Sequence, residues 1–265
     1  MSQAPVLTHI ENGVGTITLN RPQARNSLSL EMRDGLSKAV FQMRDDEQVH
    51  AVIITGAGGA FCSGGDLRLM MESTLDSVGY RERMRKLHQW FSVLVNMEKP
   101  VIAAVDGAAF GAGLSLALAA DFVIATQSAK FCAVFARIGL IPDLGAMQLL
   151  PRIVGLQKAK ELVFTARTVA ADEAKQLGMV YDIVEDAAAL QTAAQTLASR
   201  FGEASTAAIG MAKNIMNQSF ELNAQTAAEL EAYAQVTCRN SAYHQDALQR
   251  FQAKQPLRFD WDRQT

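Results

Sequence analysis

The chain has 265 residues and a mass of 28.7 kDa. Hydrophobic residues make up 49% of the sequence and charged residues 20%. This composition supplies a full hydrophobic core and excludes collagen-like, low-complexity and disordered chains. The 25 Lys and Arg residues against 27 Asp and Glu residues give a formal net charge of −2 at pH 7, so no basic surplus favours a nucleic-acid partner.

The sequence carries no motif for metal binding, disulfide pairing or membrane insertion. Cys62, Cys132 and Cys238 form no CxxC pair, and the histidines form no HExxH motif. Residues 1–20 contain no Lys or Arg and no long apolar block, so we do not expect a signal peptide. The uncharged stretch 107–120 is too short to cross a bilayer. We therefore expect no metal, no membrane contact and a reducing, cytoplasmic location.

Strand-like and helix-like segments alternate over the first two thirds of the chain. Four short apolar runs predict strands buried on both faces: residues 14–19, 49–55, 101–105 and 121–126. Apolar residues at helical spacing predict helices over residues 29–44 and 80–96. This alternation predicts an α/β fold.

The last third of the chain reads as helical throughout. Apolar residues recur at helical spacing over 190–201, and residues 206–220 and 223–251 are also predicted to be helical. We therefore expect an α/β core over residues 1–190 and a C-terminal helical segment over 191–265. This segment is expected to fold onto the core or onto a partner subunit.

A glycine-rich segment, TGAGGAFCSGGDL, follows the second predicted strand at residues 55–67. It fails the dinucleotide pattern GxGxxG, because Gly56 and Gly58 are followed by Phe61. It also fails the P-loop pattern, because Gly65 is followed by Asp66. A tight turn remains the simplest alternative to a binding loop.

A second glycine-rich segment, DGAAFGAGLSLALAAD, spans residues 106–121 and follows the third predicted strand. Gly111 and Gly113 open a run of good helix formers, which places free backbone amides at a helix start. Such amides favour negative charge developing on a ligand. The alternative is a buried Gly/Ala helix packed closely against a strand.

Together these segments resemble the crotonase (enoyl-CoA hydratase/isomerase) superfamily. The resemblance continues through NRPQARNS at 20–27, KPVIAAVDG at 99–107 and RIGLIPDLGAMQLLPR at 137–152. It covers residues 13–181 in order and spacing. It implies a spiral of ββα units with the C-terminal helical segment as an oligomerisation element or active-site cap. It also implies trimers or dimers of trimers and an acyl-CoA thioester substrate, with coenzyme A entering only as part of that substrate.

The resemblance assigns binding roles to several residues. The backbone amides of Gly65 and Ala112 would hold the thioester oxygen, where each such donor is worth roughly 3 to 4 kcal/mol on an oxyanion. Arg25 would contact a CoA phosphate, although a plain surface arginine is an equal alternative. The remaining CoA and substrate contacts would come from Gly65, Asp66, Leu67, Arg68, Ala112 and Phe135.

The catalytic positions depart from the hydratase pattern. Hydratases of this superfamily use two Glu residues, and the matching positions here are Ser115 and Phe135. Neither side chain can act as the acid or base that hydration needs, so we expect little from Ser115. Asp143, in IGLIPDLG, resembles the single acid of some isomerases of the superfamily and the nucleophile of its aryl-CoA dehalogenase. A turn or helix-cap role is the alternative for Asp143.

The leading hypothesis is therefore an enoyl-CoA isomerase that uses Asp143 as its base. A hydratase with relocated groups and a non-catalytic acyl-CoA binder remain open. An aryl-CoA dehalogenase also remains open, with Asp143 as nucleophile and His88 as base. The basic residues near His88 are interpreted as a solvated helix face: Arg81, Arg83, Arg85 and Lys86.

Overall fold

Two sheets organise the fold in the computed structural model, which describes residues 4–263. The larger sheet has six strands in the order β1-β2-β3-β4-β6-β9, and the smaller has three in the order β5-β7-β8. In the larger sheet β1 is antiparallel to β2, and the other neighbours are parallel. The strands are β1 Val6–Glu11, β2 Val14–Leu19, β3 Ala51–Gly56, β4 Val101–Val105, β5 Ala108–Phe110, β6 Phe122–Thr126, β7 Lys130–Cys132, β8 Val169–Ala170 and β9 Asp182–Val184.

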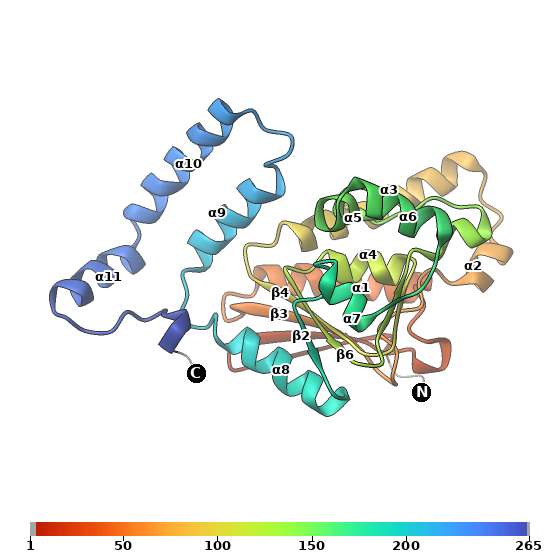
Figure 1. The fold of residues 1–265 in the computed structure, drawn as a ribbon, viewed down its shortest axis with the longest axis horizontal. Coiled ribbons are helices and arrows are strands. Elements are labelled where there is room, and N and C mark those ends of the chain that lie inside the picture. Colours follow the sequence, from red (N-terminus) through yellow and green to blue (C-terminus); the bar gives the residue numbers. More distant parts are fainter. Residues whose placement is uncertain (1–3, 264–265) are drawn as a thin grey trace.

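Helices cover both faces of the larger sheet, with α8 on one face and α1, α3 and α4 among those on the other (Figure 1). The helices are α1 Leu30–Asp45, α2 Leu67–Glu72, α3 Ser77–Val95, α4 Ala112–Leu118, α5 Ala146–Val154, α6 Leu156–Thr165, α7 Ala171–Gln176, α8 Ala187–Ser199, α9 Thr206–Asn217, α10 Ala224–Arg239 and α11 Ala242–Gln252. The short 3₁₀ helices within residues 4–263 are η1 Pro22–Ala24, η2 Val134–Ile138 and η3 Trp261–Arg263.

The continuous apolar runs are buried on both faces, as predicted. On β3, Val52 and Ile54 point into the core under α1 and α3, whereas Ala51 and Ile53 pack toward α8. Successive residues of a strand point to opposite faces, so a strand covered on both sides must be apolar at nearly every position. The predicted strands over 14–19, 49–55, 101–105 and 121–126 are confirmed as β2, β3, β4 and β6; the bounds of β2 and β4 are as predicted, and those of β3 and β6 shift by at most two residues.

The remaining strands were not predicted, and one predicted helix is broken. β1 has six residues but is a mostly exposed edge strand, so it lacks the continuous apolar run of the buried strands. β5, β7, β8 and β9 have only two or three residues each, too few to show a repeating pattern. The helix predicted over 223–251 is interrupted at Asn240 and Ser241. There the Ser241 hydroxyl accepts a hydrogen bond from the backbone amide of His244 at 3.2 Å and caps α11.

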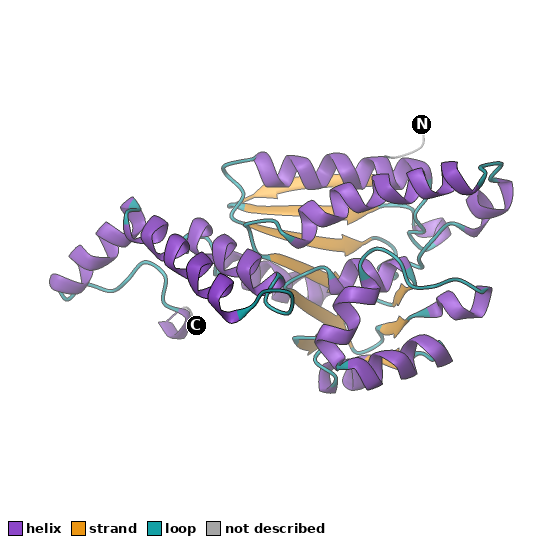
Figure 2. Cartoon of the chain, turned by 90° about the horizontal axis from the view of Figure 1, so that it is seen from above, coloured by secondary structure: helices purple, strands orange, loops and turns teal. Residues whose placement is uncertain are grey.

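The C-terminal helices form an arm that leaves the body of the molecule, seen in two orientations in Figures 1 and 2. The arm consists of α9, α10 and α11. The boundary expected between residues 190 and 191 falls inside α8, whose Leu190, Ala194 and Leu197 are buried against the sheet. After the arm the chain returns to the body, where Phe259 and Trp261 pack against Phe201 of the same core cluster.

No helix within residues 4–263 is both long and apolar enough to cross a membrane.

Candidate active site

The two glycine-rich segments lie against each other. The Cys62 amide donates to the Ala108 carbonyl and the Phe110 amide to the Cys62 carbonyl, both at 2.9 Å. A Cβ atom at Gly64 would come within 2.7 Å of the Phe110 carbonyl oxygen, and one at Gly113 would collide with the Cys62 carbonyl. The glycines therefore allow two backbone segments to approach more closely than side chains permit.

This contact brings the backbone amides of Gly65 and Ala112 into one region. Ala112 is the first residue of α4, so its amide has no acceptor within the helix. Among the described residues, neither the Gly65 amide nor the Ala112 amide donates a hydrogen bond to the protein. Gly111, with φ +55°, turns the chain sharply into α4, a conformation that suits glycine. The region thus presents two unused backbone donors.

Asp66 has a structural task at this site. Its carboxylate accepts hydrogen bonds from the Arg21 guanidinium at 3.1 Å and the Ser27 hydroxyl at 3.2 Å. It also caps α2 by accepting from the amides of Arg68 and Leu69. Burial alone would raise the pKa of Asp66, but these hydrogen bonds outweigh it and hold the pKa below its ordinary value. The Asp66 side chain therefore holds the loop and the start of α2 in place.

The other predicted CoA contacts lie at the surface of the same loops. Arg25, Leu67 and Arg68 are exposed. The Arg25 carbonyl accepts a hydrogen bond from the Ser63 amide at 2.9 Å, which attaches its turn to the glycine-rich loop. The neighbouring Asn26, which sequence reasoning did not single out, is fully buried and donates to the carbonyls of Ala57 and Ala60. Asn26 therefore holds the start of the glycine-rich loop in place.

Asp143 lies in a turn that ends at the start of α5. Its Oδ1 atom is buried and has no hydrogen-bond partner among the described residues. Burial raises the pKa of the Asp143 carboxyl above its ordinary value, while the charges of Arg33 and His88 lower it and offset part of that rise. The next residue, Leu144, is fully buried and has φ +45°, an unfavourable backbone conformation for a residue with a side chain. A buried, unpaired carboxylate oxygen in a strained turn is typical of functional sites.

Ser115 connects Asp143 to α4. Its side chain is completely buried, and its hydroxyl donates a hydrogen bond to the Asp143 backbone carbonyl at 2.8 Å. The expectation that Ser115 contributes little thus overlooked a structural contact between the candidate base and the helix that begins at Ala112. Phe135 is also buried, with its ring tip 3.8 Å from the position that a Cβ atom would occupy at Gly111. Ser115 and Phe135 therefore both lie near the first turn of α4.

His88 is exposed on α3, and its ring meets the ring of Phe91 edge-on at 6.5 Å. A Cβ atom at Gly145 would lie 2.7 Å from the ring of Phe91, so the turn of Asp143 packs directly on this part of α3. His88 is thus close enough to affect the ionisation of Asp143, without a hydrogen bond to it among the described contacts.

Cys62 is excluded as a nucleophile despite its position in the glycine-rich loop. It is fully buried, and burial raises the pKa of its thiol to about 12. The thiol is therefore protonated at neutral pH, and it is the thiolate that reacts.

Two partly buried arginines on α1 and α3 were not among the candidate site residues taken from the sequence. Arg33 on α1 and Arg83 on α3 each have a buried guanidinium nitrogen with no partner among the described residues. Arg83 was interpreted as part of a solvated face, but it shares the buried stripe of α3 with Leu87 and Trp90. The spacing of these three residues at i, i+4 and i+7 could have shown from the sequence that Arg83 lies on the buried face of α3. Both arginines line a cavity of about 600 Å³ between α1 and α3.

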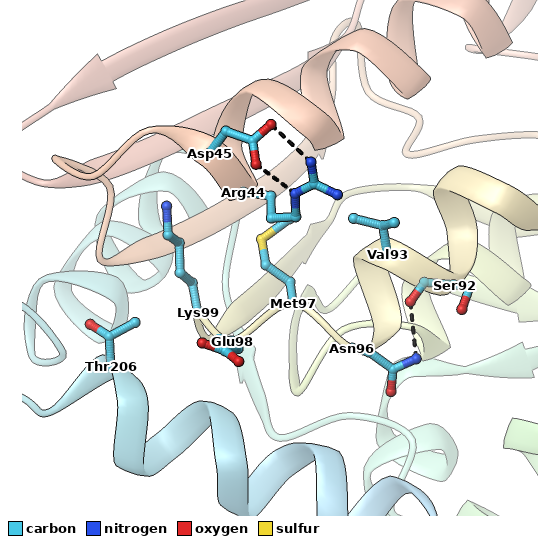
Figure 3. A pocket seen from close by; sticks show the side chains of 9 residues that line it. All are labelled: Arg44, Asp45, Ser92, Val93, Asn96, Met97, Glu98, Lys99 and Thr206. Atoms are coloured by element: carbon cyan, nitrogen blue, oxygen red, sulfur yellow. Dashed lines mark hydrogen bonds and ion pairs between the residues drawn. The ribbon is translucent and has the colours of Figure 1, made fainter. Parts of the chain in front are cut away.

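A second cavity, of about 510 Å³, lies where the arm leaves the body, and its lining includes Met97, Lys99 and Thr206 (Figure 3). None of the candidate site residues lines it. Lys99 donates from its Nζ atom to the carbonyls of Met43 and Asp46, both at 2.6 Å, and so caps the C-terminus of α1. Lys99 therefore has a structural role beside the second cavity.

Comparisons with known proteins agree with this architecture. The family profile described as Enoyl-CoA hydratase/isomerase matches residues 9–263. The chain is 36% identical to the 1,2-epoxyphenylacetyl-CoA isomerase of Escherichia coli (strain K12), over 96% of this chain and 97% of that protein. It is 32% identical to a short-chain-enoyl-CoA hydratase of Clostridium acetobutylicum, over 95% of this chain and 96% of that protein.

Comparison with solved structures points to the same family. The crystal structure of an enoyl-CoA hydratase/isomerase from Cupriavidus metallidurans CH34 matches with a TM-score of 0.92 and 35% identity, covering 98% of this chain and 97% of that one. The predicted crotonase-type α/β fold is thereby confirmed. The chain belongs to the enoyl-CoA hydratase/isomerase family of the crotonase superfamily, whose members process acyl-CoA thioesters.

Proposed function

We propose that this protein is an enoyl-CoA isomerase that moves a carbon–carbon double bond along the acyl chain. The thioester oxygen of a 3-enoyl-CoA accepts hydrogen bonds from the amides of Gly65 and Ala112. Asp143 removes a proton from the α carbon, and the electron pair moves into an enolate held by these amides. Asp143 then returns the proton to the γ carbon, which leaves a 2-enoyl-CoA. Coenzyme A takes part only as the carrier of the substrate.

The observation that carries this proposal is the buried, unpaired Oδ1 atom of Asp143. Hydration needs a base that activates water and an acid that protonates carbon, whereas a 1,3 proton shift needs one carboxylate and no water. The positions of the two hydratase glutamates hold Ser115, whose hydroxyl already donates to a backbone carbonyl, and the buried Phe135. A raised pKa makes Asp143 a stronger base toward carbon. A similar protein named as an isomerase is consistent with this chemistry.

The CoA half of the substrate is proposed to lie along the exposed surface of the two loops. Arg25 and Arg68 are exposed cations at this surface and would contact phosphates. Because the Asp66 carboxylate is held by Arg21 and Ser27, Asp66 would contribute through its backbone. Leu67, which is 55% exposed, offers an apolar contact to the pantetheine chain.

The test compares two reactions in the same preparation. We expect isomerisation of a 3-enoyl-CoA to be much faster than hydration of crotonyl-CoA, with both followed by the absorbance of the conjugated thioester. Replacing Asp143→Asn should lower kcat for isomerisation by roughly 10²- to 10⁴-fold, the usual size of a general-base contribution. Full turnover by Asp143→Asn would overturn the mechanism, and faster hydration than isomerisation would overturn the isomerase assignment. Asp172→Asn, at an exposed acid of α7, is the matched control.

A stability measurement separates loss of catalysis from loss of folding. An acid whose folded pKa is raised stabilises the fold fully below its ordinary pKa, and this contribution is lost as the pH rises through the folded pKa. At pH 7 the ionised Asp143 therefore opposes folding. Asp143→Asn should keep or raise the unfolding temperature at pH 7, and its affinity for a saturated acyl-CoA should stay near that of the wild type.

A further inference from the structure

The Arg21 guanidinium joins the two segments that meet beside the Gly65 amide. Its Nη1 atom donates to the Ser27 carbonyl at 2.9 Å and to the Asp66 carboxylate at 3.1 Å. The Ser27 hydroxyl donates to the same carboxylate oxygen at 3.2 Å. The Arg21 and Asp66 side chains are only 24% and 13% exposed, so salt screens their ion pair less than an ordinary surface pair. Arg21 therefore holds Ser27 against Asp66.

The peptide between Gly64 and Gly65 lies beside this ion pair. Its carbonyl, that of Gly64, accepts a hydrogen bond from the Leu28 amide at 2.8 Å, and Leu28 pairs with Gly65 in a short parallel bridge. In a trans peptide the C=O and N–H groups point in opposite directions. The hydrogen bond from Leu28 to the Gly64 carbonyl therefore directs the Gly65 amide away from Leu28, and this amide has no acceptor among the described residues.

No side chain on Gly64 or Gly65 helps to fix this peptide. Glycine leaves the backbone freer than any other residue, and Gly64 has φ +100°. The direction of the Gly65 amide therefore depends on contacts from neighbouring residues. Leu28 supplies one of them, and the next residue in the chain, Asp66, supplies the other. One Asp66 carboxylate oxygen accepts from two amides at the start of α2, while the other is held by Arg21.

We propose that Arg21 is a positioning residue, which fixes the direction of the Gly65 amide by holding Asp66. This role rests on the function proposed above, in which the amides of Gly65 and Ala112 bind the thioester oxygen. An oxyanion hole acts through donors that are oriented before the reaction, so a donor that can turn away stabilises the enolate less. Arg21 itself touches no reacting atom and acts only through the backbone.

Infrared spectroscopy of a bound thioester tests this role without requiring turnover. Hydrogen bonds to a carbonyl oxygen weaken the C=O bond and lower its stretching frequency. Comparing hexanoyl-CoA with and without ¹³C at the thioester carbonyl isolates this band in a difference spectrum. We expect the frequency to fall when hexanoyl-CoA binds to the wild type. Arg21→Met should lose at least about half of this shift, while its affinity for hexanoyl-CoA stays within about threefold of the wild type, because most binding energy comes from the remote CoA half.

The same variant should lower kcat for isomerisation by about tenfold with little change in KM, less than the roughly 10²- to 10³-fold cost of removing a whole oxyanion donor. Arg21→Lys keeps a cation beside Asp66 and should recover part of both effects. Ser27→Ala removes one hydroxyl donor and leaves the ion pair, so it should change the band and kcat in the same direction by less. Arg167→Met is the matched control, because Arg167 joins carboxylates on α6 and α7 outside the candidate site.

The outcomes separate this role from the proposed function. In the wild type, no binding of hexanoyl-CoA, or binding without a fall in frequency, would overturn the proposed function. A shift that is present in the wild type and unchanged in Arg21→Met would overturn the positioning role alone. Weaker binding to Arg21→Met with an unmoved band would also overturn it, since it would show a contact with CoA. Should Arg21→Met not fold, Ser27→Ala decides by the same measurement.

Discussion

At the scale of single residues, the ionisation of Asp143 links its burial to the pH dependence of the proposed reaction. The base must be ionised, and burial raises its pKa, so kcat/KM should fall as the pH is lowered through this raised value. The acidic limb of the profile should therefore lie above the range of an ordinary carboxyl group. Arg33→Met removes a charge that favours the ionised form, so the limb should move to still higher pH. A profile with the neutral substrate 3-hexenoyl-CoA measures both effects, and an unmoved limb would contradict the assignment of the base.

Ser115 is a positioning residue with a separate prediction. Its hydroxyl donates to the Asp143 carbonyl, and the turn contains two successive residues with positive φ, Leu144 at +45° and Gly145 at +73°. Removing the hydroxyl with Ser115→Ala should loosen this turn, because a strained backbone persists only where its surroundings hold it. We expect kcat to fall by about 2- to 12-fold, the equivalent of one typical hydrogen bond, with little change in KM.

Steady-state kinetics of isomerisation provide the measurement. Ser219→Ala is the matched control, because Ser219 also donates from its hydroxyl to a backbone carbonyl, at 2.7 Å, but in an exposed position outside the site. Unchanged kcat in Ser115→Ala, or a rise in KM alone, would contradict a positioning role.

The candidate site residues that the sequence offered all lie in local motifs, whereas residues that depend on tertiary contacts were missed. Gly65, Ala112 and Asp143 lie in recognisable segments, and the structure brings the first two together through close backbone contact. Arg33 could not be found in this way, because its unpaired nitrogen becomes apparent only when α1 and α3 enclose the cavity. Ser115 was dismissed because a serine cannot supply the hydratase chemistry, yet its contribution is a hydrogen bond across the fold.

At the scale of elements, strands buried on both faces were predictable, whereas the exposed edge strand β1 and the strands of two or three residues were not. β3 and β4 are apolar at almost every position, and this pattern survives in the sequence. The strands of the small sheet are held by pairing with segments that are distant in sequence, so no local pattern marks them. The arm could be read as helical, but its departure from the body depends on how α9 attaches to the sheet.

A buried ion pair makes that attachment. Lys213 of α9 donates to the Asp121 carboxylate at 2.7 Å and to the Lys99 carbonyl at 3.2 Å, and only 6% of its side chain is exposed. Asp121 also accepts from the Val101 amide at 2.7 Å, at the start of β4. Burial raises the pKa of Asp121 and lowers that of Lys213, so each charge depends on the other for compensation.

Lys213→Met should therefore destabilise the protein by about 1 to 3 kcal/mol at pH 7, less than for a fully buried pair because Asp121 keeps 25% exposure. The loss of stability caused by Lys213→Met should become smaller as the pH falls, because the unpaired Asp121 becomes protonated and no longer carries a buried charge. Chemical denaturation at several pH values measures the free energy of unfolding of the variant and of the wild type. Lys38→Met, at an exposed lysine of α1, should change stability little. A deficit that is independent of pH would contradict the electrostatic account.

At the scale of the whole molecule, the arm exposes apolar side chains that a single chain leaves uncovered. α10 and α11 contain no buried residue, whereas their exposed residues include Tyr233 at 70% and Phe251 at 76%. Val236 and Leu248 add to this surface. Apolar area gathered on a projecting element is typical of a protein–protein interface. The arm is therefore the surface through which we expect copies of this chain to associate.

We expect the protein in solution to be an oligomer of three or six copies, with a mass that is a multiple of 28.7 kDa. Tyr233→Asp and Phe251→Asp should shift light-scattering masses toward the single chain, because each places a charge in the proposed interface. Since both side chains are exposed in the single chain, neither substitution should disturb the α/β core, whose helical circular dichroism should persist. Glu231→Gln, on the exposed surface of α10, which also carries Tyr233, is the control. A wild-type mass of one chain at micromolar concentration would refute the expected association.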